Sequence, residues 1–89
     1  MNIPNKDAFR RMGMNITFPP VPPGFANDTS FSHYVVIRDP SKIAAIVVDI
    51  ACARLELRKN GHSMMQEDFN SAQDAVNAGV ARLWLGEFE

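Results

Sequence analysis

The chain has 89 residues, of which 46% are hydrophobic and 21% are charged, and its formal net charge is −1. This composition is typical of a globular chain rather than a disordered one, and the length is sufficient for one hydrophobic core. The single cysteine excludes an intrachain disulfide framework and a multi-cysteine zinc site.

The sequence shows no membrane or export signal. The longest nearly apolar run, residues 43–53, is shorter than the roughly 20 residues that a membrane span needs. The first residues, MNIPNKDAFRR, lack the apolar core of a signal peptide. We therefore expect a cytoplasmic protein that forms one small domain over residues 1–89 and has no membrane partner.

Residues 1–31 are expected to form an N-terminal arm with a Pro-rich connector. Residues 4–12 predict a short helix. The stretch Pro19–Pro23 contains four prolines, which remove backbone donors and hold φ at about −65°. Residues 32–38 (SHYVVIR) are rich in β-branched and aromatic side chains, so they predict one short strand.

Residues 39–59 carry the signals of a long helix. Asp39 is a suitable N-cap residue, and Pro40 would occupy the first helical position, where a missing N–H is harmless. The predicted helix then extends to about Lys59. Asn60 and Gly61 fit the left-handed conformation in which helices commonly end.

A second long helix is predicted directly after this end. Ser63 and Gln66 match a capping box, and the helix would extend to about Gly86. Because the link between the two helices is very short, residues 39–89 should form an antiparallel helical hairpin. The predicted fold class is therefore mainly α, a two-helix hairpin preceded by a short N-terminal helix, a Pro-rich connector and one short β-strand.

Both predicted helices have wide apolar faces. The first is apolar over more than half its circumference, and the second has an apolar seam at alternating steps of four and three residues: Met65, Phe69, Ala72, Val76, Gly79 and Leu83. Such helices need partners on more than one side. Either the N-terminal arm covers the remaining face or two hairpins associate, and we expect a homodimer or a higher oligomer.

No residue pattern indicates catalysis or metal binding. His33 and His62 are the only histidines, and their spacing matches no metal-binding motif. Cys52 has two acidic neighbours in the predicted helix, Asp49 and Glu56, which disfavour a reactive thiolate. We expect no enzymatic activity, no metal and no cofactor.

The strongest candidate binding site is the tip of the predicted hairpin. Four residues there carry or can gain positive charge: Arg54, Arg58, Lys59 and His62. Such a cluster suits a phosphate, a nucleotide or an acidic partner surface. Glu67 and Asp68 are predicted at the same tip, where they would neutralise part of this charge.

Two further groups are candidates for partner contacts. Arg10 and Arg11 lie on the N-terminal arm beside apolar residues, and Trp84 and Phe88 are large side chains near the acidic C-terminus. The two aromatic residues would form oligomer contacts or a hot spot for another protein.

The function expected from these observations is that of a non-enzymatic binding module. It would act as an oligomeric inhibitor or adaptor that engages a macromolecular partner, expected to be another protein, as small phage or mobile-element accessory proteins do. One alternative is a binder of small anionic ligands, such as nucleotides, with sites between subunits. The other is a nucleic-acid-binding regulator, although no half of the chain is basic enough for a typical nucleic-acid interface.

Overall fold

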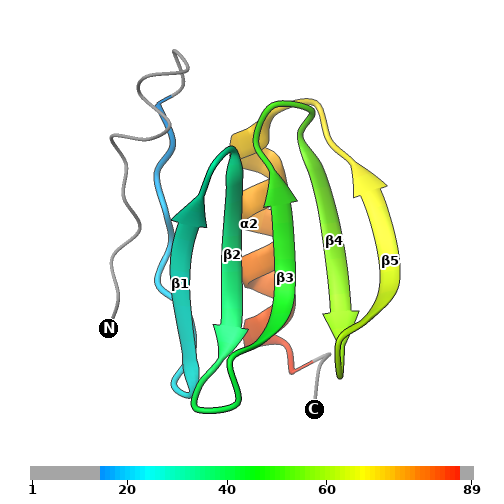
Figure 1. Cartoon of the computed structure of the whole chain (residues 1–89). Coiled ribbons are helices and arrows are strands. Elements are labelled where there is room, and N and C mark those ends of the chain that lie inside the picture. Colours follow the sequence, from blue (N-terminus) through cyan, green and yellow to red (C-terminus); the bar gives the residue numbers. More distant parts are fainter. Residues whose placement is uncertain (1–14, 87–89) are drawn as a thin grey trace.

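A five-stranded antiparallel sheet with one helix packed on it forms the protein (Figure 1). The computed structural model describes residues 15–86. The strands follow each other in chain order across the sheet: β1 (Phe25–Ser30), β2 (His33–Arg38), β3 (Ile43–Asp49), β4 (Arg54–Lys59) and β5 (His62–Asp68). The helix α2 (Ala72–Trp84) follows the last strand and covers one face of the sheet.

The predicted mainly α fold with a helical hairpin is wrong. Residues 39–59, predicted as one helix, form a turn, strand β3, a second turn and strand β4. The predicted second helix begins instead as strand β5, and only its later part, Ala72–Trp84, is helical. Its N-cap is Ser71 rather than Ser63, and the Ser71 hydroxyl oxygen accepts a hydrogen bond from the Asp74 backbone N–H over 3.1 Å.

The N-terminal part of the chain departs less from the prediction. The predicted strand at residues 32–38 is confirmed as β2. The end of the predicted N-terminal arm, from Phe25 to Ser30, is strand β1 and pairs with β2 along its whole length. The predicted helix at residues 4–12 lies outside the described residues.

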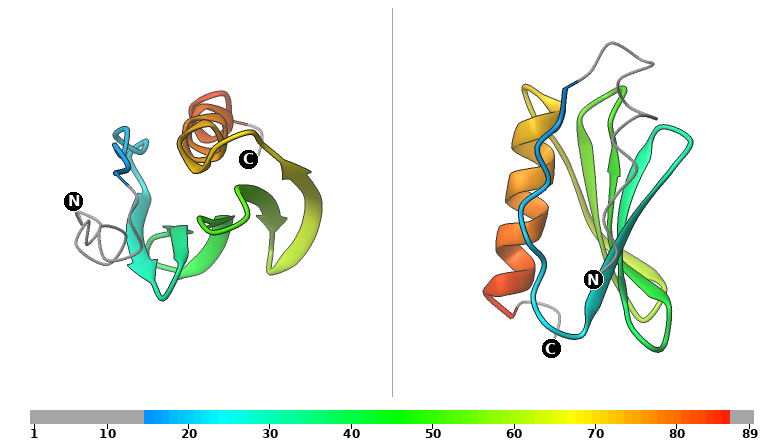
Figure 2. Two further views of the ribbon diagram at one scale, coloured as in Figure 1. Left: turned by 90° about the horizontal axis from the view of Figure 1, so that it is seen from above. Right: turned by 90° about the vertical axis from the view of Figure 1, so that its left-hand side faces the viewer.

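The core lies between the sheet and α2 because alternate strand residues point toward the helix. In the three central strands these inward residues are fully or almost fully buried: Tyr34, Val36, Ile46, Val48, Leu55 and Leu57. The helix contributes Ala75, Val76, Gly79, Val80 and Leu83. Seen from above, the sheet curls around the helix (Figure 2, left), so that a single helix covers most of one face.

The Pro-rich connector is part of the packed structure. Residues 15–24 run alongside α2 (Figure 2, right). Gln73 of the helix exchanges two hydrogen bonds with the backbone of Thr17, at 2.8 and 2.7 Å, and the Trp84 indole N–H donates to the Pro20 carbonyl over 2.9 Å. Ile16 and Val21 are buried in the core, so this segment closes the side of the sheet–helix sandwich.

Membrane insertion by a helix finds no support in the described part of the chain. Over residues 15–86, no helix combines the length and the apolar character that crossing a bilayer requires.

Candidate functional site

A cleft opens between β3 and β4 at one end of the sheet. The two strands pair from Asp49–Arg54 to Ile46–Leu57, and their pairing stops at Ile46–Leu57. Beyond this point residues 43–45 of β3 and residues 58–59 of β4 follow only their other neighbouring strands. The strands separate, and the cleft between them has a volume of about 170 Å³.

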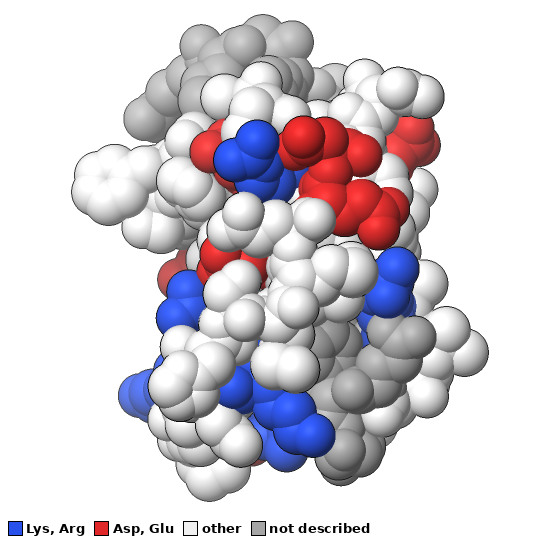
Figure 3. All heavy atoms as spheres, turned by 90° about the vertical axis from the view of Figure 1, so that its right-hand side faces the viewer, with Lys and Arg blue, Asp and Glu red and all other residues white. Residues whose placement is uncertain are grey.

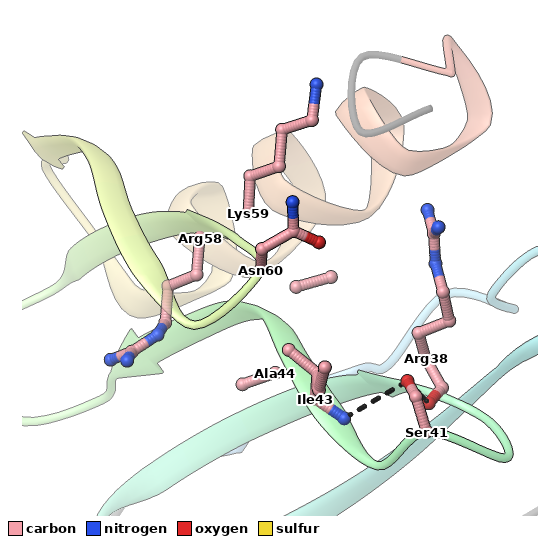
Figure 4. Close-up of a pocket in the computed structure, with 8 residues that line it drawn as sticks. Arg38, Ser41, Ile43, Ala44, Arg58, Lys59 and Asn60 are labelled. Atoms are coloured by element: carbon pink, nitrogen blue, oxygen red, sulfur yellow. Dashed lines mark hydrogen bonds between the residues drawn. The ribbon is translucent and has the colours of Figure 1, made fainter.

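Three cationic side chains line this cationic cleft, and no carboxylate of the described residues does. The described residues of the lining are Arg38, Ser41, Ile43, Ala44, Ala45, Arg58, Lys59 and Asn60. Arg38 and Lys59 come from opposite walls and extend to the same side of the cleft, whereas Arg58 extends to the other side (Figure 4). The cleft therefore presents two cations together with apolar side chains at its floor and a third cation behind them.

The Arg38 wall is shaped by the turn between β2 and β3. The Arg38 carbonyl oxygen accepts two hydrogen bonds, from the Lys42 backbone N–H over 2.6 Å and from the Ser41 hydroxyl over 2.8 Å. The Arg38 guanidinium lies 5.5 Å from the centre of the Phe25 ring, within the range of a cation–π interaction. These contacts hold the arginine at the rim of the cleft.

Arg58 is held in place from β4 and the following turn. Its Nη1 donates to Glu56 Oε1 over 2.9 Å, and its Nη2 donates to the Gly61 carbonyl over 2.7 Å. The Gln66 side-chain amide donates to the second Glu56 oxygen over 2.9 Å. This bond from Gln66, followed by the contact with Arg58, outweighs the opposing effect of burial and lowers the pKa of Glu56.

The carboxylates expected to neutralise the cluster lie at the opposite end of the sheet. Asp68 is paired with Arg54 at 2.8 Å, and Glu67 lies 3.7 Å from Arg82 of the helix. Viewed along the β5 edge, acidic side chains gather toward the end where β5 finishes, and basic ones gather toward the end where it begins (Figure 3). The molecule is therefore polarised in charge along the strand direction.

The structure divides the predicted cluster of four residues. Arg58 and Lys59 line the cleft, and the exposed His62 pairs with Lys59 across the hairpin turn. Arg54 lies at the other end of β4, five residues from Lys59, which corresponds to about 17 Å of extended strand. It belongs to the acidic end, where its bond to Asp68 is the largest cause of its raised pKa.

The other predicted contact residues lie apart from the cleft. Trp84 is 55% exposed near the C-terminal end of α2, where it also holds the Pro-rich segment. Arg10, Arg11 and Phe88 lie outside the described residues. The sequence prediction missed Arg38. A usable signal was present, because the predicted strand ends at Arg38 directly before Asp39-Pro40, a dipeptide typical of turns. That signal places Arg38 beside a turn at one end of the sheet.

The lining of the cleft suits anion binding better than covalent chemistry. Ser41 contributes the one hydroxyl of the described lining and donates it to the Arg38 carbonyl, and no histidine or carboxylate from residues 15–86 lines the cleft to activate it. Elsewhere, His33 Nε2 lies 3.6 Å from Asp49 Oδ2 on the sheet face away from the helix. Within residues 15–86, no group of three or more His, Cys, Asp or Glu side chains is arranged to hold a metal ion.

Comparison of the chain with protein-family models, with curated proteins and with solved structures gives no match.

Proposed function

We propose that this protein is a non-enzymatic binding module that docks an acidic surface of another protein with its cationic end. The observation that carries the proposal is the cationic cleft, in which Arg38 and Lys59 extend to the same side and no carboxylate of residues 15–86 is in the lining. Glu56 binds Arg58, which extends to the other side of the cleft, and Glu67 and Asp68 are engaged at the far end of the sheet. An anionic group that enters the cleft would form charge-assisted hydrogen bonds.

The size of the cleft favours one anionic group over a whole small molecule. Its volume of about 170 Å³ is below the range of about 300–1,000 Å³ that is usual for sites enclosing a small ligand. A single carboxylate or phosphate fits such a space, while the rest of its parent molecule stays outside. A side chain on the surface of a larger partner has this form.

The distribution of charge favours a protein partner over a nucleic acid. Nucleic acids present a phosphate at every step and are usually bound by an extended basic face. Here the net charge is −1, and the basic side chains of the cleft occupy one end of a sheet whose other end is acidic. A compact cationic end with an apolar floor fits a local acidic patch.

The test is a titration of the isotope-labelled protein, followed by amide NMR shifts, with three probes: a glutamate-rich peptide, inorganic pyrophosphate and a short DNA duplex. The peptide should shift the amides of Arg38, Ser41 and Asn60. The matched variants are Lys59→Gln and Arg54→Gln, since each removes one positive charge from β4. Lys59→Gln should weaken peptide binding about tenfold, because it removes one charge-assisted contact.

Arg54→Gln should leave peptide binding within about twofold, because the Debye length of about 8 Å at physiological salt screens a charge at the far end of β4. Equal losses in the two variants, or peptide shifts that bypass the cleft, would contradict the proposal. Tighter binding of pyrophosphate than of the peptide would assign the cleft to a small anion. Tighter binding of the duplex would assign it to nucleic acid.

A further inference from the structure

The outer edge of β5 is an open hydrogen-bonding edge. Among the described strands β5 pairs only with β4, and the bond from the Phe69 N–H to the Ala53 carbonyl marks one bonded pair of this ladder. In an antiparallel pair the bonded positions alternate, so the backbone N–H and C=O groups of Gln66 and Asp68 point away from β4. No other residue of the described chain bonds to these groups.

The opposite edge of the sheet, β1, is partly occupied by local contacts. The Phe25 N–H of β1 donates to the Pro22 carbonyl over 3.2 Å, and the Thr29 N–H donates to the Asp28 side chain over 2.8 Å. Both amides belong to the positions of β1 that face away from β2. With two of its outward donors already used, β1 offers a poorer template for another strand than β5 does.

We propose that a second copy of this chain pairs with β5 in the antiparallel direction, so that two sheets join into one of ten strands. Antiparallel pairing would bring the basic end of one copy, with Lys59 and His62, to the acidic end of the other, with Glu67 and Asp68 (Figure 3). Parallel pairing would place like charges together. Charged side chains usually protect an edge strand, but in the antiparallel direction these charges attract.

Exposed apolar surface on the same strand supports this arrangement. Met64, at the irregularity in the ladder between β4 and β5, is 64% exposed. A strand laid along β5 would cover part of this side chain. Because each β5 edge is used up by this pairing and two of the outward donors of each β1 are already bonded, the assembly ends at two copies.

The experiment is sedimentation equilibrium of the full chain from about 10 µM to about 1 mM, the range that suits an interface of modest size. We expect a reversible monomer–dimer equilibrium. Gln66→Pro removes an outward N–H that β4 does not use, and it should weaken the dimer at least tenfold. Gln66→Ala is the matched control: it also loses the side-chain bond to Glu56 but keeps the N–H, and it should dimerise like the wild type.

Amide hydrogen exchange of the wild-type protein tests the same edge without a variant that might misfold. The amides of Gln66 and Asp68 should become protected as the protein concentration rises. A monomer at about 1 mM, or a dimer in which these two amides stay unprotected, would overturn the inference. The result is independent of the proposed function, which is read from the amides of Arg38, Ser41 and Asn60.

Discussion

Gly79 of α2 packs directly on Leu55 of β4. A Cβ atom built on Gly79 would lie 2.9 Å from Leu55 Cδ1 and equally close to Ile46 Cδ1. Both of these side chains are fully buried, so they have little room to move. The glycine therefore sets how closely the helix approaches the sheet.

A larger residue at this position should destabilise the fold. Gly79→Val should lower the free energy of unfolding by about 2–3 kcal/mol, because overpacking a filled core outweighs the gain from removing a helical glycine. Urea denaturation measures the change. Ala81→Val, at an exposed position of the same helix, is the control and should cost only about 0.5 kcal/mol. Equal effects of the two substitutions would mean that α2 does not contact the sheet at Gly79.

A second prediction concerns Phe31, the first residue of the two-residue turn between β1 and β2. Its φ is 54°, in the left-handed region, and its side chain is 93% exposed. The left-handed conformation costs a non-glycine residue about 1–2 kcal/mol of folding free energy, and an exposed ring offsets little of this cost through packing. Phe31→Gly should therefore raise the free energy of unfolding by about 1 kcal/mol, which is about 4–8 °C in Tm for a chain of this size.

The neighbouring position provides the control for this substitution. Ser32 is not among the described residues with positive φ, so Ser32→Gly relieves no strain and should slightly lower Tm. A thermal melt followed by circular dichroism compares the two variants. A Tm of Phe31→Gly at or below that of the wild type would show that the ring stabilises the turn through a contact of its own.

The prediction of one long helix over residues 39–59 was wrong because the turn between β3 and β4 contains no residue that is typical of turns. The residues between β3 and β4 are Ile50, Ala51, Cys52 and Ala53, and Ala53 adopts a φ of 55° without being glycine. The turn is instead stabilised by Asp49, whose side chain accepts hydrogen bonds from the backbone N–H groups of Ala51 and Cys52. When no glycine or proline separates them, two buried strands give the same continuous apolar sequence pattern as one buried helix.

The sequence of the hairpin between β4 and β5 did indicate the observed structure. Asn60-Gly61 is a preferred two-residue hairpin turn, and both residues have positive φ here. Leu55 and Leu57 alternate with charged residues before it, which is the period of a strand. The helix prediction treated the same dipeptide as a helix end, because Asn and Gly serve both roles.

The candidate site could be predicted only in part for the same reason. Arg58 and Lys59 are adjacent in sequence, so both lie beside the same turn in either fold, although here their side chains extend to opposite sides of the cleft. Arg38 lies near them only because β2, β3 and β4 form a meander, in which β2 and β4 run in the same direction and finish at the same end of the sheet. A helical hairpin would have placed Glu67 beside Arg58, whereas the β4–β5 hairpin sends it to the opposite end.

Tyr34 makes the stability of the protein sensitive to alkaline pH. It is fully buried, and burial raises its pKa to about 12, opposed by a hydrogen bond of 3.3 Å from the Asn27 side-chain amide. Because the folded-state pKa lies above the unfolded value of 10.0, the neutral phenol stabilises the fold fully below pH 10. This contribution, about 2–3 kcal/mol for two pKa units, is lost as the pH rises through 10 toward 12.

The phenol can be followed directly because the chain contains one tyrosine. Its ultraviolet absorbance should show ionisation near pH 12 in the folded protein and near pH 10 in urea. Tyr34→Phe should be less stable than the wild type at pH 8 by about 1–3 kcal/mol, because the buried Asn27 amide loses its acceptor. The difference should shrink above pH 10. An ordinary tyrosine titration in the folded protein would contradict the burial of Tyr34.

Glu56 gives the opposite pH dependence. Hydrogen bonds from Gln66 and Arg58 lower its pKa below the ordinary value of 4.5. Its carboxylate therefore stabilises the fold above pH 4.5, and this contribution is lost as the pH falls through the lowered pKa. Glu56→Gln should be less stable than the wild type at pH 7, and the difference should vanish in acid. A constant difference between wild type and Glu56→Gln from pH 7 to acid would show that packing of the side chain, rather than its charge, links β4 to β5.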